Sequence, residues 1–109
     1  MSGKLVEFSA LAVRDVDEII DYYLLEGGER AASDFIQALD NASLQISRHP
    51  GAGALRYADI LGIPDVRIWP IKRFPHLVFY VEQNTFIDVW RVLHGGRDVP
   101  ASLTENGIS

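Results

Sequence analysis

The side chains best suited to chemistry are five basic residues in the C-terminal part of the chain, namely Arg67, Arg73, Arg91, His94 and Arg97. They lie on or beside segments with the composition of neighbouring strands. Antiparallel neighbours bring distant positions within side-chain reach, so the five could converge. Such a cluster would stabilise negative charge while an acid or base moves a proton. Histidine is the residue type in this set that titrates near neutral pH, so His94 is the candidate acid or base.

Arg91 also has a structural interpretation. It alternates with Val89 and Leu93, which predicts that its stem lies along buried surface. A buried guanidinium must be paired, because an unsatisfied one costs several kcal/mol. Asp88 and Asp98 are candidate partners, as are backbone carbonyl groups. In this interpretation Arg91 holds the end of its strand and the tail that follows.

His94 and Trp69 have structural alternatives as well. His94 precedes a glycine pair, where it could hydrogen-bond the backbone and shape the turn, or contact a partner. Trp69 lies beside Arg67 and could stack on a nucleic-acid base, although a strand tryptophan more often belongs to a core or an interface. Pro70 has no N–H group, which favours an edge position or a bulge for its strand.

Charge and composition exclude several classes of protein. The net charge is −5, and residues 1–64 hold five Lys/Arg against ten Asp/Glu, whereas residues 65–98 hold five against four. An acidic half argues against strong non-specific binding of nucleic acid, which needs a basic face. The chain has no cysteine and no phosphate-loop, zinc-protease or calcium-loop motif, so we expect no cofactor and no metal site. The acids Asp15, Asp17, Glu18 and Asp21 are interpreted as a solvated helix face.

No segment of the chain is suited to a membrane. The N-terminus lacks the continuous apolar region of a signal peptide, and no stretch approaches the roughly 20 apolar residues that cross a bilayer. We expect a cytoplasmic protein with a single domain over residues 1–109, which is large enough for one core.

The pattern of apolar residues predicts a strand at Lys4–Phe8 and then two helices. Ser9 is a candidate N-cap, and apolar residues follow it at helical spacing until Gly27-Gly28. A second helix is predicted over Glu29–Ser47, ending before Pro50, which cannot continue it. Two helices joined by a glycine pair form an α-helical hairpin.

Three more strands are predicted, at Asp65–Ile71, His76–Glu82 and Phe86–Leu93, with connections short enough for hairpins. The fold class is therefore α+β, with the order βααβββ, a three-stranded antiparallel meander, and helices packed on one face of the sheet. The last two strands are apolar on both faces. The second face would need a covering tail, for which Arg97–Leu103 is the candidate short tail or helix, or a partner chain.

Several short motifs accompany this order of elements. They are Tyr22-Tyr23, His49-Pro50-Gly51, Val66-Arg67-Ile68-Trp69-Pro70, Phe79-Tyr80 and Arg91-Val92-Leu93-His94-Gly95-Gly96-Arg97-Asp98. Over roughly Val6 to Leu103 the chain resembles the ParE/RelE superfamily, the toxin halves of bacterial type II toxin–antitoxin systems. The last motif looks more like the ParE branch than the RelE branch. The chain departs from the superfamily in charge, because these toxins are often basic.

The resemblance implies a non-enzymatic protein that inhibits DNA gyrase by binding, serves functions such as plasmid stabilisation, and is neutralised by a ParD-like antitoxin in a hetero-oligomer. One alternative is a RelE-like, ribosome-dependent messenger RNA endonuclease with His94, Arg91 and Arg67 as catalytic groups. A second alternative is a non-toxic module that only binds an antitoxin. The residues expected to contact the antitoxin or target are Arg67, Trp69, Arg73, Arg91, His94 and Arg97.

Overall fold

The computed structural model describes residues 3–56, 58 and 62–96. Its elements are strand β1 (Leu5–Phe8), helix α1 (Ala10–Arg48), the 3₁₀ turn η1 (Pro50–Ala52) and strands β2 (Arg67–Pro70), β3 (His76–Glu82) and β4 (Phe86–His94). The protein is of the α+β class, as predicted. The tail predicted at 97–103 lies outside the described residues.

Helix α1 begins where the sequence predicts. The Ser9 hydroxyl accepts a hydrogen bond from Ala12 N at 3.1 Å, which satisfies one of the N–H groups that the first turn leaves without a helical partner. The same hydroxyl donates to Trp90 O at 2.8 Å. The cap therefore also fastens the start of the helix to strand β4.

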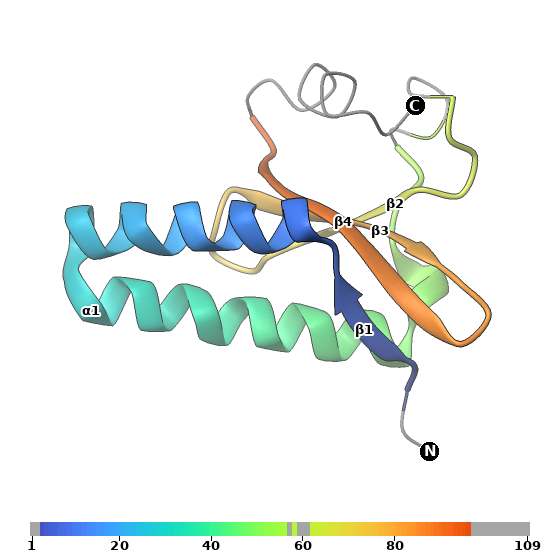
Figure 1. The fold of residues 1–109 in the computed structure, drawn as a ribbon, viewed down its shortest axis with the longest axis horizontal. Helices are drawn as coiled ribbons and strands as arrows, with labels where there is room; N and C mark the ends of the chain where they lie inside the picture. Colours follow the sequence, from blue (N-terminus) through green and yellow to red (C-terminus); the bar gives the residue numbers. More distant parts are fainter. Residues whose placement is uncertain (1–2, 57, 59–61, 97–109) are drawn as a thin grey trace.

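The structure has one long helical element where the sequence predicted two separate helices. Gly28 is its one non-helical residue, with φ 81° and ψ −172°. Only glycine adopts this backbone conformation readily, and the chain reverses there, so that two arms of α1 run side by side (Figure 1). The element ends at Arg48, just before Pro50, and Ile46 and Phe35 of its second arm are fully buried.

The sheet has four strands in the order β1-β4-β3-β2. β2, β3 and β4 are antiparallel neighbours, and β1 joins the sheet parallel to β4, with Leu5 opposite Phe86 and Phe8 opposite Val89. The sheet is therefore mixed and wider than the predicted three-stranded meander, which left the first strand without a place. β2 is an edge strand, as Pro70 indicated.

Each face of the sheet carries an apolar cluster. One cluster joins α1 residues such as Phe35 and Ile46 to Tyr80 and Val89 of the sheet. On the opposite face, Phe79 and Ile68 pack with Ala58, Ile63 and Val66 of the segment between η1 and β2. The second face was predicted to need the tail or a partner chain; the connecting segment covers part of it, and the candidate tail lies outside the described residues.

Candidate functional site

Of the five basic residues that could converge, the four that the structure describes do not form one cluster. Arg67 lies on β2, where its Nη1 donates to Gly53 O at 2.7 Å and so holds the segment that follows η1. Arg91 lies on β4, and strand β3 separates it from Arg67. Arg73 belongs to the β2–β3 turn, and Arg97 lies outside the described residues. No joint catalytic cluster of Arg67, Arg91 and His94 forms among the described residues.

Arg91 is buried and forms an ion pair with Asp15 of α1. Its Nε donates to Asp15 Oδ2 at 2.7 Å and its Nη2 to Asp15 Oδ1 at 2.8 Å, while Val92 N also donates to Asp15 Oδ2 at 3.0 Å. The hydrogen bonds to Asp15 raise the pKa of Arg91, and burial opposes this effect only partly. The carboxylate and guanidinium are thus matched in the fork geometry that makes such pairs strong.

Two predictions about this pair were wrong. Asp15 was placed on a solvated face, but only 8% of it is exposed, because it lies on the same helical stripe as Ile19 and Tyr23, four and eight residues further on. Asp88 was a candidate partner of Arg91, but Asp88 instead accepts from Trp90 Nε1 at 3.0 Å. Asp98, the other candidate, lies outside the described residues.

An irregularity in β4 accompanies this pair. Tyr80 faces Val89 and Phe79 faces Arg91, so Trp90 is an extra residue on β4. Such a bulge shifts the alternation of side chains by one position. Val89 and Val92 consequently belong to the cluster beneath α1, three residues apart instead of two. Arg91 therefore does not follow the simple alternation with Val89 and Leu93 that its sequence suggests.

His94 ends β4 beside a small cleft. Its Nδ1 accepts a hydrogen bond from Gly96 N at 3.1 Å, the turn-shaping role that was one of its predicted alternatives. Its ring meets His76 edge to face, with ring centroids 5.5 Å apart. The cleft has a volume of about 320 Å³ and lies between the first arm of α1 and the ends of β3 and β4.

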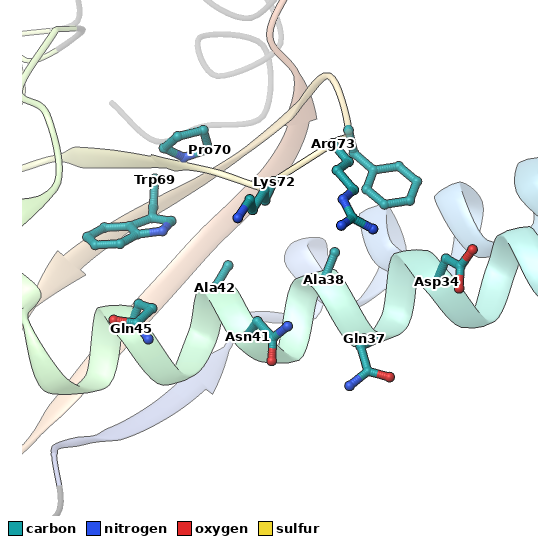
Figure 2. Close-up of a pocket in the computed structure, with 11 residues that line it drawn as sticks. Asp34, Gln37, Ala38, Asn41, Ala42, Gln45, Trp69, Pro70, Lys72 and Arg73 are labelled. Atoms are coloured by element: carbon teal, nitrogen blue, oxygen red, sulfur yellow. The ribbon is translucent and has the colours of Figure 1, made fainter.

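A larger groove, of about 580 Å³, lies between the second arm of α1 and the β2 side of the sheet. Figure 2 shows Trp69 and Arg73 pointing from the strand side towards the helix, across from Ala42 and Ala38. Its lining consists of Asp34, Gln37, Ala38, Asn41, Ala42 and Gln45 from α1, and Trp69, Pro70, Lys72, Arg73 and Phe74 from the strand side. The helix residues recur every three or four positions, so they form one stripe of alanine and amide side chains with the carboxylate of Asp34 at its end.

Two cations stand at the lip of this groove. Lys72 and Arg73 are both exposed and are the one place in the sequence where two Lys or Arg residues are adjacent. Among the described residues, neither forms an ion pair. Arg73 has φ 75°, a left-handed conformation that costs a residue other than glycine roughly 1–2 kcal/mol. The turn between β2 and β3 thus holds an arginine in a backbone conformation that favours glycine.

Among the residues that line the groove, the sequence analysis named Trp69 and Arg73 as candidate contacts but did not name Lys72 or the helix stripe. The doubled cation of Lys72 and Arg73 was a visible signal. The amide residues gave none, since an exposed glutamine or asparagine on a helix is common.

An aromatic chain connects the groove and the cleft. Phe74, which lines the groove, packs edge to face on Phe35 and on Tyr23, with ring centroids 5.3 Å apart in both pairs. Phe35 contacts His76 at 5.5 Å, and His76 contacts His94. The two hollows therefore share one wall of packed rings.

The chain thus has an α+β architecture in which the two arms of α1 lie over a four-stranded mixed sheet (Figure 1). The chain belongs to the ParE toxin family of type II toxin–antitoxin systems, since the family model described as "ParE toxin of type II toxin-antitoxin system, parDE" matches residues 6–99.

A solved structure agrees with this membership. The chain is similar to one of the chromosomal ParDE toxin–antitoxin system from P. aeruginosa, with a TM-score of 0.70 and 20% identity, over 84% of this chain and 95% of that one. At this identity the likeness concerns the fold alone. A sequence comparison with curated proteins gave no match.

Within residues 3–56, 58 and 62–96, no helix is long and apolar enough to span a membrane. Over the same part of the chain, no group of three or more histidine, aspartate or glutamate side chains is placed to hold a metal ion.

Proposed function

We propose that this chain is the toxin of a ParDE-type pair that acts by binding, inhibits DNA gyrase in the cytoplasm, and is held inactive by a ParD-like antitoxin. Membership of the ParE family supports the toxin role. The observation that carries the binding mode is the groove between α1 and β2, with its pair of exposed cations. The target and the partner are part of the proposal.

The groove has the chemistry of a site for a peptide segment that carries carboxylates. The amide side chains of Asn41 and Gln45 can donate to and accept from a peptide backbone. Trp69 offers a large apolar surface, and Lys72 and Arg73 supply charges for an acidic side chain. Elsewhere the chain is acidic, so an acidic segment is attracted to this lip and repelled from most other surfaces. A disordered acidic tail of an antitoxin, folding as it binds, matches these requirements.

Apolar side chains on the helices offer a second contact area. Large hydrophobic residues that remain exposed there include Val13, Leu24, Leu25, Ile36 and Leu44, of which Leu25 is 85% exposed. Exposed apolar side chains in such number favour a protein partner. These five side chains all lie on α1.

A binding mechanism agrees better with the basic residues than catalysis does. Arg91 is committed to Asp15 and Arg67 to Gly53 O, so neither guanidinium is aligned with His94. A nuclease would need cations and an acid–base group around one phosphate.

Purified chain should therefore stop supercoiling by DNA gyrase and leave messenger RNA intact in a translation extract. Messenger cleavage that His94→Ala abolishes would establish the nuclease instead. Expression without antitoxin and without growth arrest would favour the non-toxic binding module.

The groove is tested by charge reversal. The double variant Lys72→Glu/Arg73→Glu should weaken the complex with the ParD-like antitoxin by roughly tenfold or more, because it places like charges against the acidic segment. The double variant Arg14→Glu/Arg30→Glu is the matched control, since it changes the net charge by the same amount and both arginines are exposed and lie outside the groove. Titration calorimetry measures both, and equal dissociation constants for the two variants would remove the groove from the antitoxin site. Arg97 remains a predicted contact, which Arg97→Glu tests in the same assay.

A further inference from the structure

The cleft beside His94 is a second, chemically different hollow. Its walls come from the first arm of α1, the turn before β3 and the end of β4. Unlike the groove, it contains no lysine and no exposed arginine among its lining residues. Its described walls bring together two carboxylates, two tyrosine rings and two histidines.

Glu18 gives this cleft a negative charge. Asp15 also lines it, but that carboxylate is neutralised by Arg91, so the pair contributes little net charge. Glu18 is exposed, and within residues 3–56, 58 and 62–96 it takes part in neither of the two ion pairs. The negative charge of Glu18 also acts on the buried guanidinium of Arg91, because it contributes to raising the pKa of that group. The carboxylate of Glu18 is thus available to a cation that enters the cleft.

The two tyrosines supply aromatic surface next to that charge. Tyr22 and Tyr23 pack edge to face, with ring centroids 5.2 Å apart and an interplanar angle of 72°. Tyr23 is fixed from behind by Phe35 and Phe74, whereas Tyr22 is 56% exposed. An aromatic ring one helical turn from a carboxylate is a favourable setting for a planar cation, which can stack on the ring while pairing with the acid.

We propose that this cleft binds the guanidinium group of an arginine that a protein partner inserts between Glu18 and Tyr22. Since His94 Nδ1 accepts from Gly96 N, a neutral His94 carries its hydrogen on Nε2, from which it can donate to a carbonyl of the same inserted segment. The cleft and the groove therefore select opposite charges, arginine at one and carboxylate at the other. This inference does not depend on gyrase or on an antitoxin being the partner.

The test uses the full chain and a small probe, N-acetyl-arginine methylamide, in a titration followed by amide NMR. Its uncharged isostere, N-acetyl-citrulline methylamide, is the matched ligand. We expect the arginine probe to shift the amide signals of Gly95 and Gly96 and the ring signals of Tyr22, with a dissociation constant on the order of millimolar. The citrulline probe should shift none of them.

Variants of the chain separate the cleft from general electrostatic attraction. Glu18→Gln should weaken binding of the arginine probe by about three- to fivefold, as should Tyr22→Ala. Asp17→Asn removes an equal charge from the same helix at a position outside the cleft, and should leave the affinity unchanged. Equal shifts with citrulline, equal losses in Glu18→Gln and Asp17→Asn, or shifts mapping to other surfaces would overturn the proposal. Because gyrase inhibition is measured separately, failure here leaves the proposed function untouched.

Discussion

Removing the carboxylate of Asp15 should be among the most damaging single changes in this protein. In Asp15→Ala, the buried guanidinium of Arg91 loses both of its hydrogen bonds to that carboxylate, and Val92 N loses its acceptor as well. Breaking a buried ion pair by deleting one partner costs about 3–5 kcal/mol, because the remaining charge stays uncompensated. That is a large share of the roughly 5–15 kcal/mol by which a small domain is stable.

Urea denaturation followed by circular dichroism at neutral pH measures this loss. Asp17→Ala is the control, because it removes the same charge from the same helix arm at an exposed position. Its free energy of unfolding should stay within about 0.5 kcal/mol of that of the unaltered chain. The loss in Asp15→Ala should also persist at high salt, because ions screen a buried pair only weakly.

A double variant isolates the interaction itself. Asp15→Leu/Arg91→Met replaces both charges with apolar side chains, which often costs little or even stabilises a protein. We expect the double variant to be more stable than Asp15→Leu alone, with a coupling energy of about 1–3 kcal/mol. The reasoning is refuted if the losses of stability in Asp15→Leu and Arg91→Met add up to the loss in the double variant, or if Asp15→Ala is as stable as Asp17→Ala. In either case the ion pair does not hold α1 to β4.

Three further outcomes are expected. Ser9→Ala should lower the free energy of unfolding by about 1–2 kcal/mol, since the hydroxyl caps α1 and also binds β4, and Ser9→Thr should retain most of it in urea denaturation; a loss that Thr does not rescue would contradict the cap. Arg73→Gly should raise stability by roughly 0.5–1 kcal/mol while weakening antitoxin binding, whereas Arg73→Ala, which keeps the strained φ, should weaken binding without the gain; a thermal melt that ranks Ala at or above Gly would remove the strain argument. Burial raises the pKa of Tyr80 above its ordinary 10.0, so the unfolded chain loses this proton first and stability falls as pH rises past about 10. Tyr80→Phe should make that fall shallower without abolishing it, because the pKa of Tyr23 is raised too; denaturation curves from about pH 8 to about pH 11 check it, and an unchanged slope would exclude Tyr80 as a source.

Local features of the chain could be predicted because they depend on a few neighbouring residues. Ser9 begins the helix and Pro50 follows its end. Strand β3 has the predicted bounds, His76–Glu82, and β4 extends only one residue beyond its predicted end. The order of the short motifs along the chain, and the form of the last one, indicated the ParE family, which the family model confirms.

Features that depend on distant residues could not be predicted in this way. The periodicity of Leu5–Phe8 predicts a strand but not that its neighbour is β4. The extra residue Trp90 moves Arg91 off the alternation, and no local signal marks such a bulge. In the sequence, Asp15 resembles the other acidic residues near it, and only the fold shows that it pairs with Arg91. The basic residues that the structure describes do not converge for the same reason. Which residues face each other in a sheet depends on the register between its strands, and the sequence of one strand does not reveal that register.

The parallel pairing of β1 with β4 has a consequence for the timing of synthesis. Ser9 and Trp90 are 81 positions apart, and Asp15 and Arg91 are 76 positions apart. Ser9 and Asp15 can therefore form these hydrogen bonds only after strand β4 has been synthesised. At about 5–20 residues per second, the ribosome needs several seconds to translate that interval. A polypeptide whose translation stops before Phe86 has no partner strand for β1, and it lacks both Trp90 and Arg91, which anchor the start of α1. Incomplete chains therefore lack any activity that depends on the complete fold.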